Sequence, residues 1–231
     1  MPEPRAQDRV AAIFDCDGVL VDSEHLNREA WRLALAEHGI RLSHAVLRRF
    51  TGASADEVVR ALVGRRRIGV SRDQLKRRKL ALYLELAERD LRPRRGAKLL
   101  LRRLRAAGWR LAVASSGRRP KLHFNLTHTD LADYFEATVG IETVRRGKPA
   151  PDLFLAAARA LRIPPERCIV FEDSPLGITA AHRAKMKAVG VLGTFARPAL
   201  KNADLIIRDL SRLSPTHLRT LIRAPERSVP T

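Results

Sequence analysis

The amino-acid sequence predicts an α/β fold, an open parallel sheet covered by helices, with an all-helical segment inserted after the first strand. Two observations carry this prediction. Short apolar runs without polar alternation, typical of strands buried on both faces of a parallel sheet, alternate with stretches of helical spacing, at residues 10–14, 109–114, 168–172, 187–191 and 205–207. Residues 25 to about 92 instead hold four successive helical patterns and no strand candidate.

The helical segment leaves the predicted sheet near residues 21–24 and returns near residues 92–96. Two chain crossings of this kind form a hinge between two parts of a protein. We therefore expect a core domain made of residues 1–21 and 96–231, and a cap domain made of residues 22–95.

Apolar stripes define the first and last helices of the inserted segment. The first helix follows Asp22 or Ser23, either of which suits the N-cap position, and the last spans roughly residues 72–89. Lys79 falls on the apolar stripe of that last helix, four residues after Leu75. A lysine there either extends its ammonium past apolar neighbours to solvent or points into a cleft.

The composition excludes several classes of protein. The 231 residues are 45% hydrophobic, which suits a packed core, but no apolar run approaches the ~20 residues that a membrane span needs. Cys16 and Cys168 both lie within apolar runs, so they form no disulfide framework, and we expect a cytoplasmic protein with no membrane partner. The formal net charge of +19 predicts anionic partners. Because no recognition-helix motif accompanies this charge, we do not expect a nucleic-acid partner. We also expect a monomer.

Acidic residues follow two of the predicted strands. Asp15 and Asp17 end the run 10–14, and Glu172 and Asp173 end the run of the later strand. The carboxyl ends of parallel strands meet at one edge of a sheet, where ligands bind. Clustered carboxylates repel one another and are costly to bury unless a cation lies between them. Four acids with no His or Cys partner favour Mg²⁺ over zinc, so the sequence predicts a magnesium site formed by these four residues.

Two further segments at strand ends suit a phosphate group. Ser115, Ser116 and Gly117 follow the run 109–114, where a hydroxyl and main-chain N–H groups at the start of a helix can hold a phosphate. Lys148 comes just before the next helical stretch, in a segment stiffened by two prolines. Each signal is weak alone, but their order along the chain makes the combination specific.

In this order the segments resemble the four motifs of the haloacid dehalogenase superfamily of phosphotransferases. The resemblance spans residues 10 to about 195 and rests on three stretches: Asp-Gly-Val-Leu-Val-Asp-Ser-Glu (17–24), Gly-Lys-Pro-Ala-Pro-Asp (147–152) and Phe-Glu-Asp-Ser-Pro-Leu-Gly-Ile (171–178). It implies a Rossmann-like, doubly wound parallel sheet as the core. The helical insertion is similar to the type-one cap of that superfamily.

The resemblance also implies a role for each acidic residue. Asp15 would be the nucleophile that takes the phosphoryl group, and Asp17 would be the general acid for the leaving oxygen and then the base for water. Mg²⁺ would be held by Asp15, the main-chain carbonyl of Asp17 and Asp173, with Glu172 completing the acidic surroundings. Lys148 would neutralise further charge on the phosphoryl group.

The remaining site residues would bind substrate. Ser115, with the amides of Ser116 and Gly117, would hold the other phosphoryl oxygens, and Lys79 matches a cap lysine that faces the cleft in similar enzymes. The function this implies is a Mg²⁺-dependent phosphatase, a phosphoric monoester hydrolase acting on small phosphorylated metabolites, chiefly sugar phosphates. A dehalogenase is excluded because that branch lacks an acid at the position of Asp17.

The alternative is a β-phosphoglucomutase-like hexose phosphate mutase, which must hold a bisphosphate by both ends. Such mutases have an Arg in the cap where this chain has Ala55, and a His where it has Asn27. Both departures favour hydrolysis, while nearby cap arginines such as Arg48 leave the mutase open. Lys185 stands where the family usually has a glycine, a departure that concerns a helix end and not the chemistry.

Overall fold

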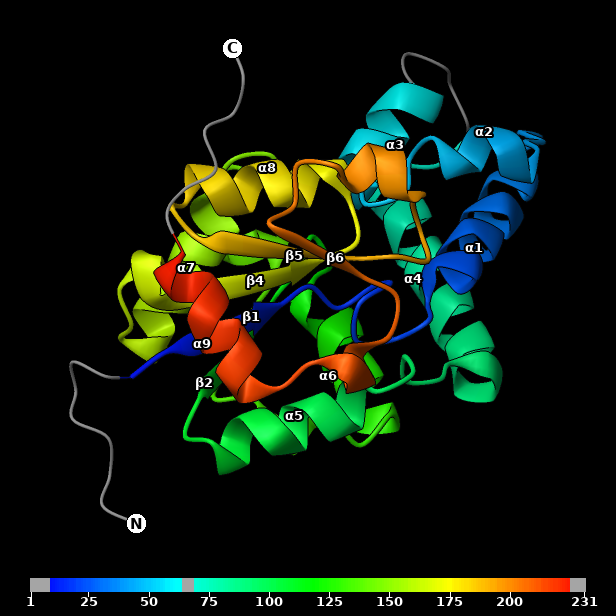
Figure 1. The fold of residues 1–231 in the computed structure, drawn as a ribbon. Coiled ribbons are helices and arrows are strands. Elements are labelled where there is room, and N and C mark those ends of the chain that lie inside the picture. Colours follow the sequence, from blue (N-terminus) through cyan, green and yellow to red (C-terminus); the bar gives the residue numbers. More distant parts are fainter. Residues whose placement is uncertain (1–8, 64–68, 225–231) are drawn as a thin grey trace.

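The computed structural model describes residues 9–63 and 69–224, and at its centre lies a six-stranded parallel sheet in the order β3-β2-β1-β4-β5-β6 (Figure 1). The strands are β1 (Ala11–Phe14), β2 (Arg110–Ala114), β3 (Ala137–Val139), β4 (Cys168–Glu172), β5 (Lys187–Val191) and β6 (Leu205–Ile207). Five of them match the predicted apolar runs to within one residue. The sixth, β3, was missed because its three residues, Ala-Thr-Val, include a polar threonine and so form no apolar run, unlike the Leu-Ile-Ile of the equally short edge strand β6.

Helices cover both faces of the sheet, which confirms the predicted doubly wound fold. Along β1, Ala11 and Ile13 pack toward one face and Ala12 and Phe14 toward the other, so strand residues of both parities are buried. That is why the run shows no polar alternation. The first face is covered by α7 (Asp152–Leu161) and α8 (Pro175–Arg183), and the second by α5 (Ala97–Ala106), α6 (Arg119–His128) and α9 (Pro215–Arg223).

The predicted helical insertion after β1 is confirmed. Its helices are α1 (Glu24–Ala36), α2 (His44–Arg48), α3 (Ala55–Leu62) and α4 (Arg72–Asp90), which we call the cap and which lie at the right of Figure 1. Helix α1 packs along α4. Ser54 and Ser71 begin α3 and α4 with capping boxes, in which the serine hydroxyl and an acidic or amide side chain each satisfy a free main-chain N–H group.

The start of α1 confirms the predicted N-cap position but lacks the capping hydrogen bond. Ser23 occupies the N-cap position, but its hydroxyl makes no capping bond and donates instead to the Asp17 carboxylate. A capping serine usually has an extended backbone that aims its oxygen at a main-chain N–H, whereas Ser23 has φ −109° and ψ −9° and turns its hydroxyl toward the carboxylate. The hydroxyl therefore holds a site residue in place and does not stabilise the helix.

The two segments that join cap and core lie next to each other. The Asp22 N–H donates to the Arg92 carbonyl at 2.9 Å, and the Arg94 N–H donates to the Leu20 carbonyl at 2.8 Å. The outgoing and returning chains thus form a short paired connection. The division into domains at residues 21/22 and 95/96 stays a prediction.

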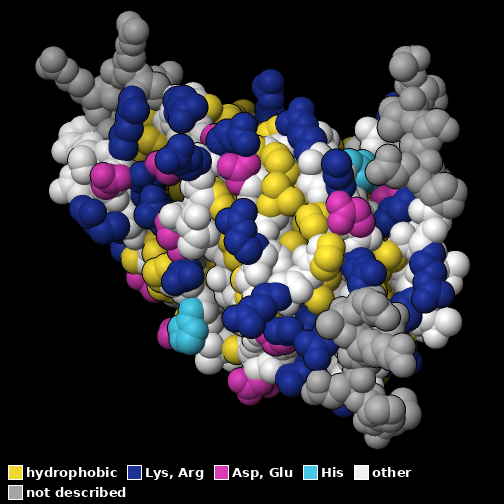
Figure 2. Space-filling view, turned by 90° about the vertical axis from the view of Figure 1, so that its left-hand side faces the viewer, with side chains coloured by type: hydrophobic (Ala, Val, Ile, Leu, Met, Phe, Trp, Pro, Cys, Tyr) yellow, Lys and Arg dark blue, Asp and Glu magenta, His cyan; other side chains and the backbone are white. Residues whose placement is uncertain are grey.

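Lys and Arg side chains are spread over the face drawn in Figure 2, with acidic and hydrophobic side chains among them. Within residues 9–63 and 69–224, no helix is both long and apolar enough to cross a lipid bilayer.

Candidate active site

The register of the parallel strands brings the predicted site residues to one edge of the sheet. Phe14 of β1 lies opposite Val113 of β2 and Phe171 of β4, so the residues that follow these strands emerge side by side. A cleft of about 560 Å³ opens there beneath the cap. All nine predicted site residues line it: Asp15, Asp17, Lys79, Ser115, Ser116, Gly117, Lys148, Glu172 and Asp173.

Lys148 forms the centre of the cleft floor. Its buried Nζ atom lies 2.5 Å from Asp15 Oδ1 and also donates to Glu172 Oε1. The other Glu172 oxygen accepts from the main-chain N–H and the hydroxyl of Ser174, each at 2.9 Å. Burial lowers the pKa of the Lys148 ammonium, but the two carboxylates outweigh it and raise that pKa above its usual value. A fixed positive charge therefore lies beside Asp15.

Asp15 and Asp173 carry more negative charge than the side chains around them neutralise. Burial raises the pKa of Asp15 to about 7, against the opposing effect of Lys148. Burial and the neighbouring Glu172 raise the pKa of Asp173 well above its usual value. The Asp173 Oδ2 atom is buried and lacks a hydrogen-bond partner among the residues described. It faces Gly18, where a Cβ atom would come within 1.9 Å of it. An unpartnered oxygen in a cradle that excludes a side chain suits a bound cation.

The four predicted metal ligands differ in the side chains that contact their carboxylates. Lys148 contacts both Asp15 and Glu172, and Lys121 contacts Asp17, so three of the four carboxylates have a cationic partner and Asp173 has none among the described residues. In the described part of the chain, no three acidic, His or Cys side chains converge as a metal site. The resemblance implies the carboxylates of Asp15 and Asp173 with the main-chain carbonyl of Asp17 as direct ligands, and the unpartnered Asp173 oxygen fits a cation there. These ligands stay a prediction.

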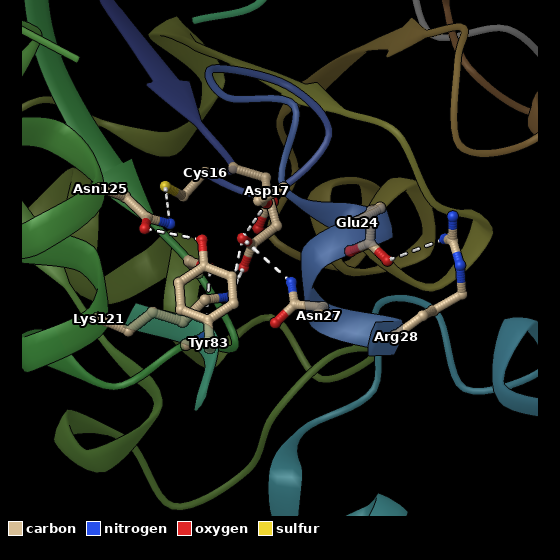
Figure 3. Close-up of polar contacts among 12 residues, drawn as sticks. Cys16, Asp17, Glu24, Asn27, Arg28, Tyr83, Lys121 and Asn125 are labelled. Carbon is tan, nitrogen blue, oxygen red and sulfur yellow. Dashed lines mark hydrogen bonds and ion pairs between the residues drawn. The ribbon is translucent and has the colours of Figure 1, made fainter. Parts of the chain in front are cut away.

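Asp17 is paired with Lys121, a residue that the sequence analysis missed. The Nζ atom of Lys121 lies 2.8 Å from Oδ1 and 2.6 Å from Oδ2 of Asp17, and Oδ1 also accepts from Ser23 and, at 3.4 Å, from Asn27 (Figure 3). Burial alone would raise the pKa of Asp17, but Lys121 and Ser23 outweigh it and hold that pKa below its usual value. One signal was available: Lys121 lies in the first turn of α6, where a cation opposes the helix dipole unless an acid is near.

Ser115 and the next two residues form the predicted phosphate loop between β2 and α6. Ser115 is buried, and its Oγ atom accepts from the Gly117 N–H at 3.2 Å. This bond turns the loop back on itself at the cleft. The role of the three residues in holding a phosphoryl group stays a prediction.

Lys79 points into the cleft, which decides between the two orientations that the sequence left open. It is 8% exposed, and its Nζ atom donates to Asn27 Oδ1 at 2.8 Å and lies 5.1 Å and 5.6 Å from the ring centres of Tyr83 and Trp31. Burial and the neighbouring Lys121 lower the pKa of this ammonium to about 7. Asn27 thus bridges Asp17 and Lys79.

Comparisons with known proteins agree with this geometry. The model of the haloacid dehalogenase-like hydrolase family matches residues 10–185. Validoxylamine A 7'-phosphate phosphatase of Streptomyces hygroscopicus subsp. limoneus is 36% identical over 208 residues, which cover 90% of this chain and 97% of that protein. Beta-phosphoglucomutase of Bacillus subtilis (strain 168) is 33% identical over 214 residues, which cover 88% and 91% of the two chains.

A solved structure extends the likeness to three dimensions. CbbY from Rhodobacter sphaeroides, in complex with phosphate, has a TM-score of 0.84 to this chain at 25% identity, and the match covers 91% of this chain and 99% of that one. The order of the motifs, the helical cap inserted after β1 and the family match over residues 10–185 lead to one conclusion: the chain belongs to the haloacid dehalogenase-like hydrolases.

Proposed function

We propose that this chain is a Mg²⁺-dependent phosphatase that hydrolyses small phosphorylated metabolites, chiefly sugar phosphates, through an aspartyl phosphate on Asp15. One observation carries the proposal: the buried Asp15 carboxylate at the end of β1 has the Lys148 ammonium at 2.5 Å, and it shares one cleft with Asp17 and Ser115. The family and the phosphatase among its similar relatives support the same reaction.

The first half of the reaction transfers the phosphoryl group to the enzyme. A carboxylate oxygen of Asp15 attacks phosphorus and the bond from phosphorus to the ester oxygen breaks. Asp17, ionised beside Lys121 in the free enzyme, takes a proton from the monoanionic ester as it binds and donates that proton to the leaving oxygen. Lys148, fixed between Asp15 and Glu172, offsets the charge of the transferring group, while Ser115 holds another of its oxygens.

The second half releases phosphate. Asp17, now ionised, takes a proton from a water molecule as the water oxygen bonds to phosphorus. The bond between phosphorus and the Asp15 oxygen then breaks, which restores the Asp15 carboxylate and the protonated Asp17. Because one residue acts first as acid and then as base, its position beside Asp15 governs both halves.

A divalent metal fits the carboxyl edge of β1 and β4 for the reason given above, the unpartnered Asp173 oxygen beside Asp15. The carboxylates of Asp15 and Asp173 with the Asp17 main-chain carbonyl would hold it. When bound, Mg²⁺ would supply positive charge between the nucleophile and the phosphoryl oxygens. We expect activity to vanish with EDTA and to return with Mg²⁺, and we expect Ca²⁺, whose coordination shell is larger and looser, to restore little.

Two cap residues favour hydrolysis over the mutase alternative. Ala55 lines the cleft at the position where the mutases have an arginine for the distal phosphate, and Asn27 stands in place of their histidine. A mutase must keep water from the aspartyl phosphate while its bisphosphate intermediate reorients. Without those two groups we expect water to react first.

A metabolite panel tests the proposal. Purified protein in Mg²⁺ is incubated with phosphorylated sugars and related esters, and inorganic phosphate is measured. We expect release from at least one of them. Incubation with β-glucose 1-phosphate, primed with glucose 1,6-bisphosphate, should form no glucose 6-phosphate above background. Sustained glucose 6-phosphate formation without matching phosphate release would contradict the phosphatase and establish the mutase.

A further inference from the structure

One face of α6 contacts both the catalytic loop and the cap. Lys121 and Asn125 lie one helical turn apart on this face, and both are buried. Lys121 contacts both carboxylate oxygens of Asp17. The Asn125 amide nitrogen lies 3.8 Å from the sulfur of Cys16, the residue between Asp15 and Asp17 in the sequence (Figure 3). Two side chains of a core helix therefore contact consecutive residues of the loop that carries the chemistry.

The cap reaches the same face through Tyr83 of α4. This side chain is fully buried, and its hydroxyl donates to Asn125 Oδ1 at 2.8 Å. The Lys121 Nζ atom lies 4.5 Å from the centre of the Tyr83 ring, within range of a cation–π contact. Helices α4 and α6 also pack against each other. The cap thus contacts both α6 side chains that contact the catalytic loop.

Lys121 is costly to place where it is. Its ammonium is buried, and it lies in the first turn of a helix, where the dipole disfavours a cation. Asp17 already accepts from Ser23 and Asn27 on Oδ1, whereas Lys121 contacts both oxygens and so fixes the rotation of the carboxylate. A contact that constrains orientation is what a group needs if it must meet a leaving oxygen at a defined point.

We propose, on the basis of the function proposed above, that Lys121 is a positioning residue for Asp17 and that the Tyr83–Asn125 contact makes its position depend on the seated cap. Lys121 itself transfers no proton. It holds the Asp17 carboxyl where that group gives its proton to the ester oxygen as the bond to phosphorus breaks. The cap, by contacting Asn125 and Lys121, completes this arrangement when it lies over the substrate.

Two esters of similar size separate this role from a structural one. p-Nitrophenyl phosphate has a good leaving group that needs little help from an acid, whereas benzyl phosphate releases an alkoxide that needs a proton. The ratio kcat/KM reports formation of the phosphoenzyme and excludes its later hydrolysis. We expect Lys121→Met to lower kcat/KM about 100-fold on benzyl phosphate and less than about 3-fold on p-nitrophenyl phosphate, since general acid catalysis contributes 10²–10⁴-fold.

Three further variants test the arrangement. Lys121→Arg, which keeps the charge and can contact both carboxylate oxygens, should retain benzyl phosphate activity within about 10-fold of wild type. Tyr83→Phe keeps the ring and loses the hydroxyl, so it should lower the same rate about 5-fold, and it should add nothing to Lys121→Met because both act through Asp17. Lys201→Met, on an exposed lysine outside the cleft, serves as the control and should match wild type.

The outcomes are distinct. Equal losses of Lys121→Met on both esters, or no loss on either, would overturn the positioning role, and additive effects of Lys121→Met and Tyr83→Phe would overturn the link to the cap. Should Lys121→Met fail to fold, Lys121→Gln, which keeps a hydrogen-bond donor, carries the same comparison. A wild type that hydrolyses neither ester in Mg²⁺ would contradict the proposed function itself.

Discussion

Two buried lysines line the same cleft in opposite electrostatic settings. Lys148, on the core side, lies between the carboxylates of Asp15 and Glu172, whereas Lys79, on the cap side, has an amide oxygen and two aromatic rings as its neighbours. The core lysine is bonded to two carboxylates, while the cap lysine is bonded to none of the carboxylates in the described residues. The difference indicates that the core provides fixed chemistry and that the cap provides a charge for part of the substrate to meet.

The largest expected effect lies on the core side. Asp15→Asn removes the nucleophile and keeps its shape, because an amide oxygen does not attack phosphorus. We expect kcat to fall by about 10⁴-fold or more on every ester, with an unchanged melting profile. The measurement is phosphate release in saturating Mg²⁺. A variant that keeps more than a few per cent of wild-type activity would contradict the assignment of Asp15 as the nucleophile.

Replacing Lys148 and Lys79 by methionine should have different effects on kcat and KM. Lys148→Met should lower kcat about 10²–10³-fold on all esters, because it removes charge from the transferring group. Lys79→Met should instead raise KM, about 10- to 100-fold and only for esters with a second anion, since a charge-assisted contact contributes about 1.5–3 kcal/mol. Steady-state kinetics on glycerol 3-phosphate and 3-phosphoglycerate provide the matched pair. Equal effects of Lys79→Met on both esters would contradict the role given to the cap.

The sequence predicted which core residues lie together at the cleft, because their placement follows from short-range rules. Residues after parallel strands must emerge at one edge, and the alignment of Phe14 with Val113 and Phe171 follows from parallel pairing. Residue types at those positions then indicated the chemistry. The roles themselves still depend on the experiments described here.

The contacts between cap and core could not be predicted in the same way. Tyr83 and Asn125 are 42 positions apart, so their meeting depends on how α4 rests on α6, while Asp17 and Lys121, both in the core, are 104 apart and meet through the packing of α6 against the sheet. No periodicity in either helix encodes that packing. The same limit applies to Ser23, whose position indicated a helix cap but whose hydroxyl donates to the Asp17 carboxylate in the folded protein.

The pH dependence should distinguish the two lysines further. The pKa of the Lys148 ammonium is raised, so it stays charged across the neutral range, whereas burial lowers the pKa of Lys79 to about 7. Below pH 7 Lys79 is mostly an ammonium and above it mostly a neutral amine. The KM for 3-phosphoglycerate should therefore rise, relative to that for glycerol 3-phosphate, by up to about 10-fold per pH unit above 7.

The ratio of the two KM values removes the titration of the phosphate, which both esters carry. In Lys79→Met the ratio should be independent of pH and equal to the high-pH value of wild type. A wild-type ratio that stays flat from pH 6 to 8.5 would mean that Lys79 keeps one charge state throughout.

The smallest expected effect lies in the core but outside the cleft, at the end of α8. Lys185 has φ of 59°, and its N–H and that of Met186 donate to the carbonyls of His182 and Ala181, the pattern of a helix end that favours glycine. A side chain in this left-handed conformation is strained, while glycine gains freedom in the unfolded chain that partly offsets the relief. We expect Lys185→Gly to stabilise the fold by about 0.5–1 kcal/mol, or roughly 1–4 °C in Tm for a chain of this size.

This substitution should leave kcat and KM unchanged, because the exposed Lys185 side chain does not line the cleft. Lys201→Gly is the control: Lys201 has φ of −55°, a conformation in which glycine relieves no strain, so that variant should be no more stable than wild type. A loss of activity in Lys185→Gly, measured at 25 °C where both proteins are folded, would mean that the end of α8 affects the Glu172–Asp173 loop that precedes this helix. Unchanged kinetics with a higher Tm would instead show that a lysine in place of the usual glycine at position 185 affects only the stability of the fold. The contrast between Lys148 and Lys79 would then be a property of the cleft alone.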